Sequence, residues 1–285
     1  MFSGCVYAIL KQDSRSGTDS CQLILKEEHA VILGARAHNP EQAETLAKSE
    51  VPFVEISVLS AEEFQQNLKK LCLLRDTHGI QFLAHGPEEG NAWEPEFLKK
   101  ELLPQINAIT DCLGELGIDL LTIHFWLDHR FIEPGILDQK IPILRAMAEH
   151  AAAQGVWLCV ENLSEQALDF ERAFAEIERL GMTLDIGHAQ LLSEKNTAYD
   201  FLAQYSEKIY HMHVHDNFGG SSQSDDLHLL PGQGSIDFKA ILKKTHQMGY
   251  NRTMTLEVEP EQVLQGMHYI QQVWDAVSSS ERTAS

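Results

Sequence analysis

The chain has 285 residues, and 44% of them are hydrophobic, so it can bury a large core and lacks the composition of a disordered protein. Its 22 Lys and Arg stand against 42 Asp and Glu, and the net charge of −20 disfavours general binding to nucleic acid or anionic membranes. The five cysteines form no CxxC pair, no apolar run reaches the roughly 18 residues of a membrane span, and the first residues lack the features of a signal peptide. We therefore expect a cytoplasmic protein that does not enter a membrane.

Short apolar runs alternate with longer amphipathic segments from residue 31 onward. Each run is five to seven residues long and rich in Val, Ile, Leu or Phe, which is typical of parallel strands buried on both faces. In chain order, the predicted strands are 31–36, 52–58, 80–85, 120–125, 156–162, 182–186, 209–215 and 252–258.

Helices are predicted between these strands. The first begins at Ser60, which forms a capping box with Glu63, and it ends before Gly79. The others span 97–116, 141–154, 169–180 and 237–248. Each is followed by a Gly, the residue that most easily takes the left-handed conformation at a helix end.

Eight strands that alternate with helices predict a single-domain α/β fold, a (β/α)₈ TIM barrel over residues 31–277. A doubly wound open sheet is the alternative, but no GxGxxG motif follows the first strand, which disfavours a dinucleotide-binding version. We expect residues 1–30 to form an extension that caps the bottom of the barrel. Residues 278–285 are expected to form a C-terminal tail.

Acidic and imidazole side chains end six successive predicted strands, and more follow the seventh. In chain order they are His85, His124, Glu161, Asp185, His188, His213, His215, Asp226, His228 and Glu257. In a barrel these strand ends converge on one face, where active sites are built. Carboxylates mixed with imidazoles suit Zn²⁺ or Mn²⁺, whereas sites made only of oxygen atoms suit Mg²⁺ or Ca²⁺. The sequence therefore predicts a metal centre at this face.

Each of these residues also has a plainer interpretation. A lone histidine such as His85 is more often hydrogen-bonded than a ligand, and a lone glutamate such as Glu257 could be a salt-bridge partner. The ordered pattern over six strand ends favours metal binding all the same.

The seventh strand carries three histidines on one face. They recur in steps of about 6.6 Å, too far apart for all three to bind one ion. We expect His211 to be a deeper core imidazole and His215 to contact the ligands or the substrate. His38, just beyond the first strand, is a candidate for lining the pocket.

Five segments carry a resemblance to a known family: 160–162, 184–188, 213–216, 226–238 and 256–258. They resemble the xylose isomerase-like TIM barrel superfamily, which comprises sugar and sugar phosphate isomerases and epimerases together with the apurinic/apyrimidinic endonucleases (AP endonuclease family 2). The resemblance covers about residues 31–277. It implies a core metal ion held by Glu161, Asp185, His213 and Glu257.

The endonuclease branch of this superfamily holds two further zinc ions. The resemblance assigns one to His85, His124 and the shared Glu161. It assigns the other to His188, Asp226 and His228. The chain has the matching residue type at all nine positions, so it implies one to three divalent ions, Zn²⁺ or Mn²⁺.

Two enzymatic functions follow from the resemblance. In a sugar, sugar phosphate or polyol isomerase or epimerase, Glu161 and Glu257 would move a proton through an enediolate that the ion stabilises. His188 would position a hydroxyl, and Trp126 would cover the substrate. In a phosphodiesterase, clustered zinc would activate a water molecule. A third possibility is a metal-bearing barrel that binds a partner without catalysis.

The number of Lys and Arg in the loops after the strands distinguishes the two enzymatic functions. A DNA-binding barrel needs Lys and Arg around its strand ends, but the loops 87–90, 163–165 and 218–226 contain none. Arg36, Arg130 and Lys195 are the obvious cations near that face, and Trp93 and Phe218 could also cover a small ligand. We therefore expect a small sugar or sugar phosphate substrate rather than nucleic acid, with an oligomer possible.

The glycine-rich segment 231–235 allows two interpretations. Its free N–H groups could cradle a phosphate at the start of the helix 237–248. The plainer prediction, which we favour, is a turn with Ser235 as the N-cap.

Overall fold

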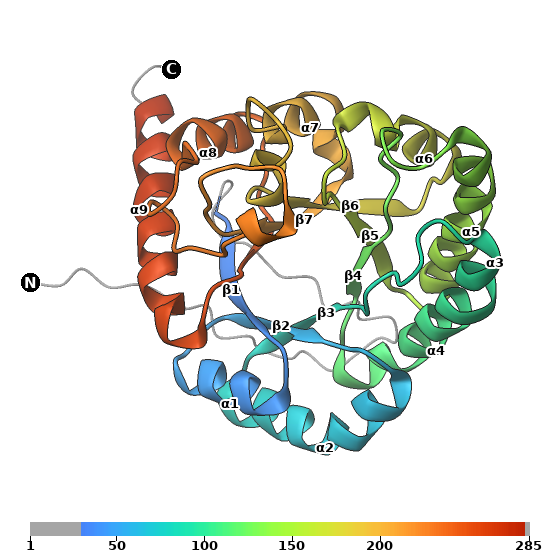
Figure 1. Cartoon of the computed structure of the whole chain (residues 1–285). Coiled ribbons are helices and arrows are strands. Elements are labelled where there is room, and N and C mark those ends of the chain that lie inside the picture. The colour runs from blue at the N-terminus through green and yellow to red at the C-terminus, as the bar shows by residue number, and fades with distance from the viewer. Residues whose placement is uncertain (1–29, 283–285) are drawn as a thin grey trace, which may run out of the picture.

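The computed structural model describes residues 30–282 as one closed barrel of eight parallel strands. The ring closes where Ile32 of the first strand pairs with Thr253 of the last (Figure 1). The strands are β1 (Ile32–Ala37), β2 (Phe53–Ser57), β3 (Gln81–His85), β4 (Leu120–His124), β5 (Trp157–Glu161), β6 (Leu180–Asp185), β7 (Ile209–Val214) and β8 (Thr253–Leu256). This topology confirms the predicted (β/α)₈ barrel. The predicted N-terminal cap lies outside the described residues, apart from residue 30.

Helices surround the strands as an outer ring (Figure 1). They are α1 (Pro40–Lys48), α2 (Ala61–His78), α3 (Pro95–Phe97), α4 (Leu103–Leu113), α5 (Pro134–Ala153), α6 (Glu171–Glu176), α7 (Ala198–Tyr205), α8 (Phe238–Gln247) and α9 (Val263–Arg282). A π-helical segment, Leu98–Leu102, joins α3 to α4. Within residues 30–282, no helix is both long enough and apolar enough to span a membrane.

The predicted start and end of α2 are confirmed. The Ser60 side chain accepts a hydrogen bond from the Glu63 N–H, and Gly79 takes a φ of 70° while donating its N–H to the Arg75 carbonyl. These contacts satisfy backbone groups that the helix ends leave without partners.

Several predicted boundaries are wrong. The helix predicted from residue 141 begins at Pro134. The helix predicted over 169–180 ends at Glu176, and Leu180 and Gly181 already belong to β6. Gly181 is required by close packing, because a Cβ there would lie 2.7 Å from the Cys159 sulfur and 3.0 Å from the Tyr210 ring. At the other end of the chain, α9 runs into the predicted tail because Ser278 is buried and continues the helix.

The interior of the barrel is apolar at its bottom. Phe53, Leu83, Leu120 and Cys159 form a buried cluster there, close to the amino ends of the strands. The Phe53 ring fills the space beside Gly34, where a Cβ would lie 2.5 Å from the ring. Polar side chains are therefore concentrated higher in the barrel, towards the carboxyl ends of the strands.

The loop between β7 and α8 is organised by Asp216, which is fully buried. Its carboxylate accepts hydrogen bonds from the N–H groups of Gly232 at 2.8 Å, Gly234 at 2.9 Å and Ile236 at 3.2 Å. These donors are consequently not free to cradle a phosphate. The N-cap of α8 is Asp237 and not the predicted Ser235, because the Asp237 side chain accepts the Ala240 N–H.

We expect Asp216→Ala to lower the melting temperature strongly. Hydrogen bonds to a charged acceptor contribute about 1.5–3 kcal/mol each, so losing these three should cost at least roughly 4.5 kcal/mol. For a domain of this size that corresponds to a decrease of at least about 9 °C by differential scanning fluorimetry. The matched control is Asp225→Ala, which removes a partly exposed carboxylate that accepts the Ser221 and Ser222 N–H groups. Equal melting of the two variants would contradict the role assigned to Asp216.

Candidate metal centre and cavity

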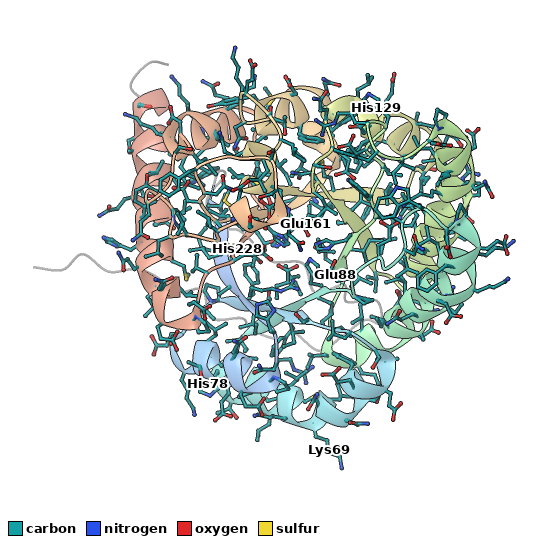
Figure 2. All side chains as sticks on the ribbon, viewed as in Figure 1. Lys69, His78, Glu88, His129, Glu161 and His228 are labelled. Atoms are coloured by element: carbon teal, nitrogen blue, oxygen red, sulfur yellow. The ribbon has the colours of Figure 1, made fainter. Side chains whose placement is uncertain are left out.

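A cavity of about 770 Å³ opens at the carboxyl ends of the strands. Figure 2 shows Glu161 near the centre of the ring of strands, with Glu88 and His228 around it, whereas His78 and His129 lie at the periphery. The lining residues come from the ends of most strands and the loops that follow them. They include Arg36, His38, Ser57, His85, Glu88, His124, Trp126, Glu161, His188, Leu191, Leu192, Asp226, His228 and Glu257.

The four residues predicted to hold the core ion lie together. One ligand atom from each of Glu161, Asp185, His213 and Glu257 falls within 4.8 Å of all the others. The Nδ1 atom of His213 lies 3.2 Å from Glu161 Oε1, 3.5 Å from Glu257 Oε1 and 3.7 Å from Asp185 Oδ2. Strands β5, β6 and β7, with the residue that follows β8, thus supply a compact group of three carboxylates and one imidazole.

The other predicted ligands form two adjoining groups. The Nε2 atoms of His85 and His124 lie 3.0 and 3.2 Å from Glu161 Oε2. On the opposite side, Asp226 Oδ2 lies 3.2 Å from His188 Nε2 and 3.1 Å from His228 Nε2. The structure therefore brings all nine predicted positions together around one end of the barrel.

The acids of the cluster are held in their charged forms. Burial alone would raise the pKa of the Glu161 carboxyl, but His213 and His124 hold this pKa well below its ordinary value. Asp185 behaves in the same way, since His188 and His215 outweigh burial and hold its pKa low.

Four of the imidazoles, those of His124, His188, His213 and His228, are correspondingly held in their protonated forms by raised pKa values, whereas burial and Arg36 lower the pKa of His85. Burial opposes protonation of His124, yet Glu161 and Glu88 raise its pKa to about 10. Burial likewise opposes protonation of His228, yet Asp226 and Glu257 raise its pKa to about 9. Protons thus balance the carboxylates, and a divalent cation could replace them.

Two buried atoms beside His188 and His228 have no hydrogen-bond partner, namely His215 Nδ1 and Asp226 Oδ1, and Nε and Nη1 of Arg36 elsewhere in the cavity lining lack one too. His215 Nδ1 and Asp226 Oδ1 face each other at 3.6 Å. Buried polar atoms normally have a partner, so this pair leaves room for a ligand or ion beside His188 and His228. The donor set and these orphaned atoms fit a divalent metal centre.

The sequence analysis missed Glu55, a fully buried residue of β2. It accepts a hydrogen bond at 2.9 Å from His213 Nε2, on the side of the ring away from the other carboxylates, and another at 3.2 Å from His211 Nε2. Arg36 Nη1 lies 3.4 Å from its other oxygen. The available signal was a glutamate inside the apolar run of β2, because an acid buried in a strand needs a partner.

His211 lies below His213, as expected for a core imidazole. It is fully buried, and its Nδ1 lies 2.7 Å from the Thr253 hydroxyl while its Nε2 lies 2.9 Å from the Thr255 hydroxyl. Burial lowers the pKa of His211, which favours the neutral ring.

The expected substrate contacts are met unequally. His188 and Trp126 line the cavity, whereas His215 is fully buried and lies 3.1 Å from Asp185 Oδ1, with its ring stacked on that of His228. Trp93 and Phe218 are exposed and do not line the cavity.

The cationic candidates also differ in position. Arg36 and His38 line the cavity. Arg130 is paired with Asp128, and Lys195 lies outside the lining.

Comparison with known proteins places this geometry in context. A family model described as "Xylose isomerase-like TIM barrel" matches residues 38–273. Inosose isomerase of Bacillus velezensis is 22% identical over 172 residues, which cover 56% of this chain and 60% of that protein. Among solved structures, a D-tagatose 3-epimerase-like protein has a TM-score of 0.76 and 23% identity, covering 88% of this chain and 99% of its own. An IOLI protein with a bound zinc atom has a TM-score of 0.68 and 16% identity, with the same coverage. The structural similarities establish the fold.

The stability of the metal-free protein should decrease as the pH rises from 6.5 to 9. His124 and His228 have pKa values of about 10 and 9 in the folded chain and an ordinary value of 6.5. Their protons therefore stabilise the fold fully below pH 6.5, and this contribution is lost as the pH rises through the folded pKa values. The measurement is thermal unfolding across this range with excess chelator.

His124→Gln should reduce the slope of this pH dependence. His78→Gln, at the end of α2, should leave the slope unchanged. A melting temperature that stays constant or increases over the same range would contradict the assignment.

Proposed function

The chain belongs to the xylose isomerase-like TIM barrel family, and from that premise we propose that it is a divalent-metal-dependent isomerase or epimerase of a sugar, sugar phosphate or related polyol. The observation that carries the proposal is the position of two glutamates. Glu161 and Glu257, from non-adjacent strands, both lie beside His213 Nδ1, and both line the cavity. This arrangement suits a pair of groups that act on one small substrate from two sides.

Glu161, Asp185, His213 and Glu257 would hold the ion. When bound, it supplies Lewis-acid stabilisation of negative charge on substrate oxygen atoms. This donor set suits Zn²⁺ or Mn²⁺, and the zinc in the IOLI structure agrees with that choice. The two adjoining histidine groups would allow up to three ions.

In the proposed reaction, one glutamate takes a proton from a substrate carbon next to a carbonyl. The other, after taking up a proton from solvent, returns it to the opposite face of that carbon or to the neighbouring carbon. In the second case the hydroxyl proton also passes from one substrate oxygen to the other, so that the carbonyl moves. The substrate keeps its composition, and both carboxylates regain their starting state after a proton is exchanged with solvent or between them. His188 would donate a hydrogen bond to a substrate hydroxyl, and Trp126 would cover the ring. We assign His215 to the positioning of Asp185.

A zinc-dependent phosphodiesterase of the endonuclease type is the second candidate. It is favoured by the assembly of all three ligand groups, including His85 and His124 on Glu161. It is disfavoured by the cavity wall, where Arg36 is the only Lys or Arg among the described lining residues, and Arg36 is already paired with Glu55. Phosphates need free cations or ions to neutralise them.

Replacing Glu257 by Gln should remove most bound metal and abolish proton exchange. The ligand set would lose one of its charged oxygen donors, which lowers the affinity for a divalent ion. The measurements are metal content by mass spectrometry and incorporation of deuterium from D₂O into D-tagatose, other ketohexoses and inososes by NMR. The matched control is Glu259→Gln, an exposed carboxylate two residues beyond Glu257 and outside the cavity lining, which should retain metal and exchange.

Full metal retention and exchange by Glu257→Gln would contradict the proposal. Metal binding without exchange on any of these compounds would favour a non-catalytic barrel. Metal-dependent nicking of abasic duplex DNA would favour the phosphodiesterase instead.

Glu55→Gln should weaken metal binding by about 10- to 100-fold, the usual effect of losing a carboxylate behind a ligating histidine. Glu55 accepts the Nε2–H of His213 and so directs Nδ1 towards the other ligands. The Kd for Mn²⁺ by calorimetry tests this, beside the melting temperature of the metal-free protein. Ser57→Ala, at the end of the same strand, is the control. If Glu55→Gln left the Kd for Mn²⁺ unchanged but lowered the melting temperature of the metal-free protein, Glu55 would have a structural role only.

A further inference from the structure

Three aromatic side chains, Trp93, Trp126 and Phe131, pack against one another near the charged cluster, and we call them the aromatic shelf. The rings of Trp126 and Phe131 are stacked at 5.2 Å with 24° between their planes, and both line the cavity. Trp93 supports them from outside, with its ring edge-on to Trp126 and its Nε1–H donated to the Phe131 carbonyl at 3.2 Å. Phe131 is 44% exposed. An exposed apolar surface at a cavity wall is a typical binding feature.

Buried charges hold this shelf in place. Glu89 accepts the Trp126 N–H at 2.8 Å and is ion-paired with Lys140 of α5, which is itself fully buried. The Trp126 Nε1–H is donated to the Ser164 hydroxyl at 2.7 Å. A buried ion pair is costly to desolvate, so its position is closely constrained. The Glu89–Lys140 pair fixes the backbone at Trp126, because Glu89 accepts the Trp126 N–H.

Leu191 and Leu192, in the loop after β6, add a second apolar face to the same cavity. Leu192 has a φ of 52°, which is rare for a side chain of its size, and strained residues of this kind concentrate at ligand-binding sites. Its N–H is donated to the Gly220 carbonyl at 2.7 Å. Its carbonyl accepts from Arg130 at 3.4 Å.

Arg130 connects the two faces. Its guanidinium group donates hydrogen bonds to the carbonyls of Leu192 and Ser164, and it forms an ion pair with Asp128. One side chain thus ties together the loops after β4, β5 and β6. Because its charge is already matched by Asp128, it does not offer a free phosphate-binding site.

The cavity is also larger than a metal-bound monosaccharide requires. A water molecule, which has one non-hydrogen atom, occupies about 30 Å³ in the liquid. A hexose has about twelve non-hydrogen atoms, and because these are covalently bonded they pack more closely than separate water molecules. A hexose therefore needs less than about 360 Å³. That is under half of the 770 Å³ present. Trp126, Phe131, Leu191 and Leu192 supply apolar surface to the cavity, whereas Ser164, Ser221, Ser222 and Gln223 supply polar groups. We name the space beside Trp126, Phe131, Leu191 and Leu192 the apolar slot.

We propose that the substrate is a conjugate, in which a polyol that keeps its carbonyl lies over the metal-binding cluster and a flat apolar group, such as an aryl substituent on a carbon away from that carbonyl, occupies the apolar slot. The proposal rests on the proposed function for its polyol half. The leucines and Phe131 have no side-chain hydrogen-bonding atoms, and the Trp126 Nε1–H is already donated, so the slot suits an aryl group better than a second sugar ring or a phosphate.

The test compares phenyl β-D-glucoside, glucose, maltose and phenol by calorimetry on the Mn²⁺-loaded full chain. We expect the phenyl glucoside to bind at least about tenfold more tightly than glucose or maltose, as burial of one aromatic ring implies. Phe131→Ala should remove this preference and leave the affinity for glucose unchanged. Phe218→Ala, an exposed aromatic outside the cavity, is the matched control and should retain it.

Three results would overturn the proposal: equal affinity for phenyl glucoside and glucose, maltose binding as tight as phenyl glucoside, or no measurable binding of either phenyl glucoside or phenol. Metal content and deuterium exchange report separately on the proposed function. Absence of the phenyl preference in the unaltered protein, with metal and exchange intact, defeats this inference alone. Phenyl binding that depends on Phe131 in a protein without metal or exchange defeats the proposed function alone.

Discussion

The structure depends on the crowding of opposite charges at the carboxyl ends of the strands. Glu161 shows the constraint most clearly, because four imidazoles lie 3.0–3.2 Å from its oxygens: His85, His124, His188 and His213. A buried carboxylate stays charged only with such partners, and buried imidazoles stay protonated only beside carboxylates. Protons or cations must therefore balance the cluster. This single requirement links the pKa shifts, the fit to a divalent ion and the pH dependence of stability.

The charged side chains are confined to one end of the barrel, because the interior changes from apolar at the bottom to polar at the carboxyl ends of the strands. Apolar residues close the bottom around Phe53, and a middle layer follows in which Glu55 and His211 satisfy each other and the threonines of β8. The candidate metal ligands lie above this layer, at the carboxyl ends of the strands. Glu55 belongs to the middle layer but contacts His213 above it, so the orientation of a ligand is fixed from below by a residue that no solvent reaches. The loops above are fixed by their own buried acids, Asp216 and Glu89.

The sequence predicted the barrel because its strands are buried on both faces and therefore read as continuous apolar runs. It predicted the grouping of the candidate ligands because the strand ends must meet in a closed barrel, so chain order alone brings Glu161 and Glu257 together. It could not predict Glu55, whose importance depends on its facing β7 across the barrel interior. It also misplaced the end of α6, since Gly181 resembles a helix stop although its function is close packing between strands. Long-range side-chain contacts of this kind leave no periodic signal.

The ligand set does not by itself distinguish the two enzymatic functions, because the isomerase and endonuclease branches draw on the same strand ends. The walls of the cavity distinguish them. Duplex DNA carries a dense row of phosphates that must be neutralised, whereas here Arg130 is matched by Asp128 and the glycine N–H groups after β7 are taken by Asp216. The lining combines imidazoles and carboxylates with aromatic and aliphatic carbon, and it adds the uncharged polar side chains of Ser164, Ser221, Ser222 and Gln223. Under the proposed function, such a cavity suits hydroxyl groups together with apolar surface, and the loops after β4 and β6, which carry that surface, set the proposed specificity.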